Sequence, residues 1–268
     1  MTLVGTVDGP SRMQRRRLGA LRDTLAITQR NLITIRRIPA LLVFTLIQPV
    51  VFVLLFRYVF GGAIRGTGGN YVDYLMPGIF VQTVVFGATS TAIGLATDVK
   101  SGMLERFHSL PMARSAVLAG RTLADLARNL LVVILMGAVG YLVGFRVHTG
   151  VADFAIGMLL VLFFSYSFSW IFATVGLAVG DPESAQAAVF PVMAPLVFAS
   201  SVFVPVATMP GWLQAWAKYQ PVSVTASAVR GLLEGGPVAS DLTQALAWCA
   251  GIVAVCAPLA VWRYRRTV

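Results

Sequence analysis

Charged residues are scarce in this sequence, and their scarcity limits the class of protein that it can form. Only 12% of the 268 residues are Asp, Glu, Lys or Arg, whereas 57% are hydrophobic and the mean hydropathy is +0.78. So few polar side chains cannot cover the surface of a soluble globular protein of this length. The composition therefore indicates a chain whose solvent is a lipid bilayer.

Reactive and metal-binding side chains are also scarce. The two cysteines, Cys249 and Cys256, lie on one apolar segment at a spacing that cannot close a disulfide. His108 and His148 fall in segments that we expect on opposite sides of the membrane, so they cannot share a metal ion. The 11 carboxylates form no acid–base cluster, and no serine or cysteine lies in a recognisable nucleophile motif. We therefore predict no catalytic residue and no metal site.

A recognisable energy source is missing as well. A phosphate-binding loop needs two glycines at fixed spacing before Lys-Ser, but Val99 stands where the second glycine should precede Lys100 and Ser101. Ion-coupled carriers keep ionisable groups near mid-membrane, and the centres of the apolar windows have none. We therefore predict that the chain does not hydrolyse ATP alone and does not use a proton or sodium gradient.

Long windows without charge predict the membrane spans, because about 20 helical residues cross the hydrocarbon core. Five windows have the length of one span, and a sixth, residues 184–217, is too long for one span and too short for two. Its prolines, Pro191, Pro195 and Pro205, remove helix hydrogen bonds that lipid cannot replace. The six predicted spans cover about 38–58, 74–97, 125–145, 154–180, 185–206 and 242–262.

Helices are also expected outside the spans. Apolar residues recur at near-helical spacing over 18–38, which predicts an amphipathic helix on the membrane surface; a solvated basic arm is the alternative. The aromatic residues of 210–234 predict short external re-entrant helices between spans five and six, with a plain external loop as the alternative. The predicted fold is an all-α integral membrane protein, with a basic arm at 1–17 and a single transmembrane domain at 18–268.

The distribution of positive charge predicts the orientation. Fifteen of the 21 Lys and Arg residues fall in segments that face the cytoplasm when both chain ends lie inside, and five fall on the other side. The net charge of +10 therefore reflects membrane topology and does not indicate a nucleic-acid partner. Residues 1–37 hold eight arginines and no apolar stretch before a cleavage site, so we expect an uncleaved first span.

Uncharged polar side chains inside the spans suggest a pathway for a largely apolar molecule that carries a few polar groups. Hydrogen bonding between helices is the alternative for each of them. Asp125 and Arg128, three residues apart at the inner end of the third span, predict a structural ion pair. The candidate pathway residues are Gln48, Gln82, Thr83, Ser165, Tyr166 and Ser169.

Four segments of the sequence have a familiar pattern: residues 102–125, GMLERFHSLPMARSAVLAGRTLAD; 181–191, DPESAQAAVFP; 75–98, LMPGIFVQTVVFGATSTAIGLATD; and 209–236, MPGWLQAWAKYQPVSVTASAVRGLLEGG. Together they resemble one known family, the type-2 ABC transporter permeases of the daunorubicin and doxorubicin resistance type. The first two segments resemble the first and second cytoplasmic loops of that family, the third is similar to its second span, and the fourth is similar to its external re-entrant helices. The resemblance runs from about residue 20 to the end of the chain.

This resemblance implies a permease that exports hydrophobic or amphipathic compounds, such as drugs, antibiotics or lipids, across the cytoplasmic membrane of a bacterium. It implies two separate ABC ATP-binding subunits that use ATP and Mg, a second permease subunit, identical or related, and surrounding membrane lipids. The residues that it implies for contact with the ATP-binding subunits are Glu105, Arg106, His108, Leu110, Pro111, Arg114, Asp181, Glu183 and Gln186.

Two other functions stay open. The same fold can serve export of a polysaccharide or another polar polymer, which would call for more aromatic and polar residues along a wide path. A membrane-embedded lipid enzyme or a scaffold belongs to a different class, and the scattered carboxylates and histidines disfavour the enzyme.

Overall fold

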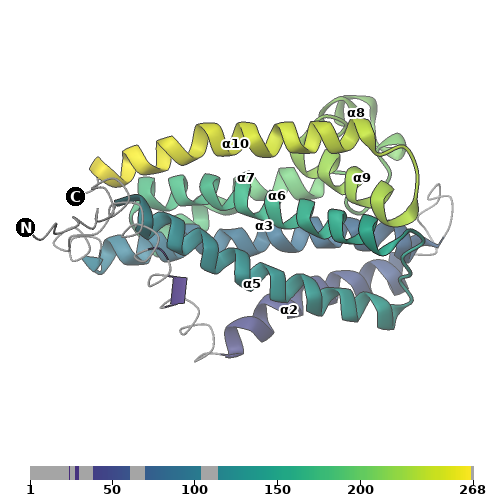
Figure 1. Ribbon diagram of the computed structural model, residues 1–268, viewed down its shortest axis with the longest axis horizontal. Helices are drawn as coiled ribbons and strands as arrows, with labels where there is room; N and C mark the ends of the chain where they lie inside the picture. Colours follow the sequence, from purple (N-terminus) through teal and green to yellow (C-terminus); the bar gives the residue numbers. More distant parts are fainter. Residues whose placement is uncertain (1–23, 25–27, 30–38, 61–69, 104–113, 267–268) are drawn as a thin grey trace, which may run out of the picture.

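A computed structural model describes residues 24, 28–29, 39–60, 70–103 and 114–266, with the side chains of 39–45 and 114–117 left out. The described part contains eight α-helices and no strand. Helices α3, α5, α6, α7 and α10 run along the long axis of the molecule, and α8 and α9 gather at one end (Figure 1). The elements are α2 (Pro39–Leu54), a π-helical turn η1 (Leu55–Phe60), α3 (Tyr71–Lys100), α5 (Arg114–Val143), α6 (Val151–Val179), α7 (Pro182–Phe198), a short 3-10 turn η2 (Val206–Thr208), α8 (Gly211–Ala217), α9 (Pro221–Glu234) and α10 (Ala239–Arg266).

Four helices are long and apolar enough to cross a membrane: Tyr71–Lys100, Leu118–Val143, Val151–Val179 and Ala239–Arg266. They coincide with the second, third, fourth and sixth predicted spans. The first predicted span falls on α2 and η1, which contain a shorter apolar stretch, Leu46–Phe60. The fifth falls on α7, which has 17 residues. The count of six spans therefore stays a prediction.

Helix α7 differs in its bounds from the predicted fifth span, 185–206. It begins earlier because Asp181 caps it: the Asp181 carboxylate accepts a hydrogen bond from the Ser184 amide, and Pro182 occupies the first turn. It ends earlier, at Phe198. Pro191 and Pro195 each remove a backbone donor inside it, so the helix is already weakened there.

Helix α3 forms the centre of the bundle, because α5, α6, α7 and α9 all pack against it. Glycines allow the closest approaches. A Cβ atom at Gly78 would overlap the backbone of Val202, and one at Gly176 on α6 would overlap the backbone of Ala92 on α3. Small residues let membrane helices approach in this way, where packing replaces the hydrophobic effect as the source of stability.

A partly buried cation, Arg230 of α9, ties the end of the bundle together. Its guanidinium lies 3.6 Å from the ring centroid of Tyr74 and donates to the carbonyl oxygens of Tyr74 and Ser201, each at 3.0 Å. The Tyr74 hydroxyl donates to the same Ser201 oxygen at 3.0 Å, and the Tyr71 hydroxyl donates to Phe203 at 2.9 Å. These bonds join α3, α9 and the turn that follows α7.

Helices α8 and α9 are the two short helices expected between the last two spans. Most of α9 is buried, whereas the aromatic residues around α8 are exposed, with Trp212 77% and Tyr219 59% exposed. Exposed Trp and Tyr side chains are typical of the membrane interface. Entry of these helices into the membrane stays a prediction.

The predicted amphipathic helix at 18–38 and the basic arm at 1–17 lie outside the described residues, apart from Thr24, Thr28 and Gln29. The Thr28 hydroxyl donates to the Gly120 carbonyl of α5 at 3.0 Å. This bond joins the segment before the first span to the start of α5.

We expect Arg230→Met to lower the free energy of unfolding by about 2–3 kcal/mol, because two charged hydrogen bonds and a cation–π contact are lost. For a chain of this size the melting temperature in detergent should fall by about 5–10 °C. Lys218→Met, which removes an exposed cation near the same end, is the control and should leave melting nearly unchanged. Equal melting of the two variants would contradict the tying role of Arg230.

Candidate functional site

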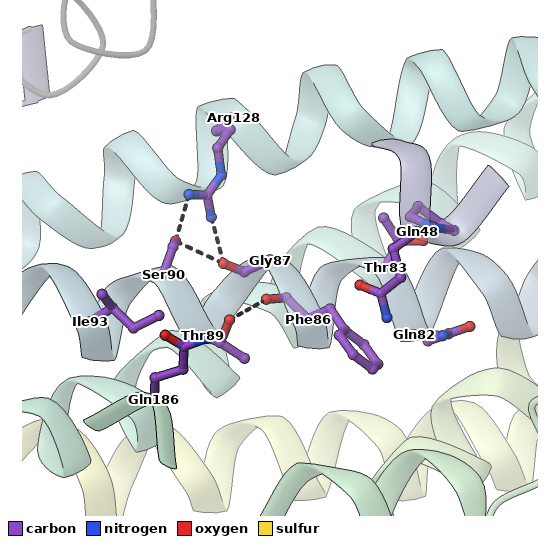
Figure 2. Close-up of a pocket in the computed structure, with 11 residues that line it drawn as sticks. Gln48, Gln82, Thr83, Phe86, Gly87, Thr89, Ser90, Ile93, Arg128 and Gln186 are labelled. Carbon is purple, nitrogen blue, oxygen red and sulfur yellow. Dashed lines mark hydrogen bonds between the residues drawn. The ribbon is translucent and has the colours of Figure 1, made fainter. Parts of the chain in front are cut away.

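A cavity of about 550 Å³ lies between α2, α3, α5 and α7. Figure 2 shows its side chains, with those of α3 running along one wall and Arg128 of α5 above them. A smaller hollow of about 320 Å³ shares four of its residues and extends it along α7 past Val189, Phe190 and Met193. The larger cavity is lined by Gln48, Pro49, Gln82, Thr83, Phe86, Gly87, Thr89, Ser90, Ile93, Arg128 and Gln186.

Three of the six predicted pathway residues, Gln48, Gln82 and Thr83, line this cavity. The Thr83 hydroxyl donates to the Ile79 carbonyl of its own helix at 2.7 Å. The Gln82 side-chain oxygen is buried and has no hydrogen-bond partner among the described residues. A buried acceptor without a partner is costly, so this oxygen is suited to accept a hydrogen bond from a molecule in the cavity.

The other three predicted pathway residues take part in contacts within the bundle. The Ser165 hydroxyl accepts a hydrogen bond from the Asn129 amide at 2.6 Å, and the Ser169 hydroxyl donates to the Ser165 carbonyl at 3.0 Å. The Tyr166 ring packs edge-on against Trp170, with centroids 6.0 Å apart. None of the three lines the cavity of Figure 2, and their place in a pathway stays a prediction.

The predicted pair of Asp125 and Arg128 is present, with 3.3 Å between the carboxylate and the guanidinium. Arg128 also donates to the Ser90 hydroxyl at 2.5 Å and to the Gly87 carbonyl at 2.6 Å (Figure 2). The Thr91 hydroxyl donates to the carboxylate of Asp125 at 2.5 Å. The pair therefore joins α5 to α3 through three residues of α3, as a partly buried charge pair requires.

Sequence reasoning missed the second role of Arg128, which is to line the cavity. It also missed Thr89 and Ser90, whose hydroxyls donate to the carbonyls of Phe86 and Gly87 at 2.7 and 2.8 Å. One signal in the sequence could have indicated this role. Of the 21 Lys and Arg residues, Arg128 is the one that was assigned to neither side of the membrane, because it lies at the inner edge of the third predicted span.

Asp181 and Glu183, two of the predicted contact residues, lie at the start of α7. The Asp181 carboxylate accepts a hydrogen bond from the Lys100 ammonium at 2.7 Å, which joins the end of α3 to α7. This hydrogen bond lowers the pKa of Asp181 from 3.8 to about 2. A lowered pKa means that the ion pair is complete above about pH 4 and is lost only as the pH falls through about 2.

Gln186, the third predicted contact residue on this segment, lies one helical turn beyond Asp181 and Pro182 and lines the cavity. A second ion pair, Arg121 to Asp98 at 2.6 Å, joins α5 to α3 near Lys100. Five of the predicted contact residues lie outside the described residues, and the side chain of Arg114 at the start of α5 is also left out. The five are Glu105, Arg106, His108, Leu110 and Pro111.

Comparisons with known proteins agree on one family. The family model described as ABC-2 type transporter matches residues 22–233. The daunorubicin resistance ABC transporter permease protein DrrB1 of Streptomyces coeruleorubidus is 36% identical over 93% of this chain and 88% of its own length. The probable doxorubicin resistance ABC transporter permease protein DrrC of Mycobacterium tuberculosis is 31% identical over 91% and 88%. The putative transport permease ycf38 of Cyanophora paradoxa is 25% identical over 78% and 73%.

We expect the Asp125 and Arg128 side chains to be energetically coupled. Arg128→Gln leaves a partly buried carboxylate without its cation, and Asp125→Asn leaves the cation unpaired, so each variant should be destabilised. The double variant should be more stable than the sum of the two losses by about 1–3 kcal/mol. Thermal unfolding of the four proteins in detergent measures this coupling, and strictly additive losses would show that the pair contributes nothing.

Proposed function

This chain belongs to the ABC-2 type transporter family, and we propose that it is the permease subunit of an ATP-driven exporter of hydrophobic or amphipathic compounds. Relatives that match most of the chain are named as daunorubicin and doxorubicin resistance permeases, so a drug or antibiotic is the first candidate cargo. A lipid is the second. A separate ATP-binding partner would use ATP and Mg, and this chain would supply the path.

The cavity between α2, α3, α5 and α7 is the observation that carries this proposal. Its volume of about 550 Å³ falls within the range of small-molecule sites. Phe86 and Ile93 supply apolar wall, and the amides of Gln48 and Gln82 supply isolated polar groups. Such a lining suits a largely apolar molecule with a few hydrogen-bonding groups. A polar polymer would need polar contacts along its whole length, and Val189, Phe190 and Met193 of the adjoining hollow do not provide them.

We propose six spans in a bacterial cytoplasmic membrane, with both chain ends in the cytoplasm and α8 and α9 as re-entrant helices on the outer side. Residues 18–268 would form one transmembrane domain. A second permease subunit would face α2 and α7, where Val51, Phe190 and Phe198 expose apolar side chains next to the open cavity. A second copy on this side would turn the cavity into a path enclosed by two subunits.

The start of α7 supports a short route from the ATP-binding subunits to the cavity. Two such subunits would contact the loop that contains Glu105 and the exposed Glu183 at the start of α7. Asp181 joins this start to the end of α3, and Gln186 on the next turn lines the cavity. The contact segment and one wall of the cavity thus belong to the same helix. A displacement of the start of α7 would therefore move that wall directly.

We expect Gln82→Leu to reduce export several-fold, because it removes the buried amide oxygen that has no partner among the described residues and keeps a similar volume. Doxorubicin accumulation in cells that express the permease with its ATP-binding subunit measures export. Gln244→Leu, at an exposed position of α10 that does not line the cavity, is the matched control and should export normally. Unchanged export by Gln82→Leu at equal membrane abundance would remove the cavity from the path.

We expect Glu105→Ala to abolish export while membrane insertion stays normal. Loss of a contact with the ATP-binding subunit should also lower the amount of that subunit that co-purifies with the tagged permease in detergent. Export and co-purification at wild-type levels would count against the proposed contact, and a pull-down in which no P-loop ATPase appears with the wild-type chain would count against the exporter itself.

A further inference from the structure

A second hollow, of about 630 Å³, lies between α5 and α6 and shares no residue with the cavity of Figure 2. It reaches the end of the two helices where the connecting segment 144–150 joins them, the same end that carries α9 (Figure 1). The hollow is lined by Leu130, Val133, Ile134, Gly137, Tyr141, Phe145, Arg146, Val147, Phe154 and Met158.

The floor of this hollow is apolar and open. A Cβ atom at Gly137 would meet no other atom within 4 Å, so the helix surface has a notch there. Ile134 and Tyr141, one turn to either side, are 60% and 63% exposed. From Leu130 to Tyr141 the lining extends about 16 Å along α5. This length matches half of a hydrocarbon core that is about 30 Å thick.

Arg146 is the one charged residue of the lining, and it lies at the rim. Its guanidinium lies 4.1 Å from the Tyr141 ring centroid, and one nitrogen, Nη1, donates to the carbonyls of Tyr141 and Phe145 at 2.9 and 2.8 Å. Its backbone amide donates to the carboxylate of Asp73 at 3.0 Å. Within the described part of the chain, no carboxylate forms an ion pair with this guanidinium, which is exposed. The cation is thus held in place without being neutralised.

We propose that this hollow binds one anionic phospholipid, with an acyl chain along α5 over Gly137 and the phosphate against Arg146. An apolar groove one leaflet deep that ends in an un-neutralised cation matches the two parts of such a lipid. The lipid would come from the leaflet at the α9 end, which is the outer leaflet in the proposed topology. The proposal needs no assumption about the cargo, because the cavity of Figure 2 shares only helix α5 with this hollow and none of its lining residues.

Native mass spectrometry of the full-length protein in detergent tests the proposal, with phosphatidylglycerol and phosphatidylcholine of the same acyl chains as probes. The wild type should retain one phosphatidylglycerol about fivefold more readily than one phosphatidylcholine, as expected for one basic side chain near a headgroup with a net negative charge. Phosphatidylcholine has the same phosphate, but its choline ammonium cancels that charge. Arg146→Gln should bring the ratio close to one. Gly137→Leu should fill the notch and weaken binding of both lipids.

Two control variants separate this site from the general lipid surface. Lys218→Gln removes another exposed cation near the α9 end, and Gly251→Leu fills another open helix position, on α10. Both should bind the two lipids as the wild type does. The proposal is overturned if the wild type shows no preference, if Arg146→Gln keeps the preference, or if Lys218→Gln loses it equally. Displacement of the bound lipid by equimolar doxorubicin would assign the hollow to cargo instead.

Discussion

The close packing of α3 against its neighbours is the constraint on which the rest of the structure depends. At Gly78, Gly87 and Gly176 a single added carbon would collide with a neighbouring helix or turn. Inside the bilayer, apolar side chains gain little by leaving lipid for protein, so the hydrophobic effect does not hold the helices together. Close contact between them therefore depends on complementary shape. With α3 held in this way, its polar residues meet their partners: Tyr74 meets Arg230 at one end, and Ser90 meets Arg128 farther along.

Three cations of the described residues differ in what surrounds them. Arg128 and Arg230 are partly buried, and each donates to at least one backbone carbonyl and contacts a specific side chain. The guanidinium of Arg146 is held by carbonyls and an aromatic ring, and within the described part of the chain it forms no ion pair with a carboxylate. A partly buried cation that donates hydrogen bonds to a neighbouring helix serves the fold, whereas an exposed cation without an ion pair is available to an anionic ligand.

Charge-free windows were enough to locate four long helices, because the cost of an ion in hydrocarbon acts on composition alone. The same signal misplaced the end of α7, since a window without charge does not register where prolines weaken a helix. Charge counting places Arg230 on the side opposite the chain ends, but counting predicts a side and not a depth, so it could not predict the packing of Arg230 against Tyr74. Gln82 and Ser165 look alike in the sequence as polar residues within spans. The orientation of each helix about its own axis gives them different surroundings: the Gln82 side chain lines the cavity, whereas the Ser165 hydroxyl contacts Asn129.

The two prolines inside α7 have a mechanical consequence. Each lacks the amide that would bond to the carbonyl four residues earlier, so the helix near Met193 and Gln186 is joined by fewer hydrogen bonds than an uninterrupted helix. Bending at a proline therefore breaks few additional backbone hydrogen bonds. Of the helices around the cavity, α7 contains two internal prolines, whereas α2 and α3 contain one each, Pro49 and Pro77, so α7 should bend most readily. A displacement of Asp181 at the start of α7 would then change the shape of the cavity by bending α7 against α3.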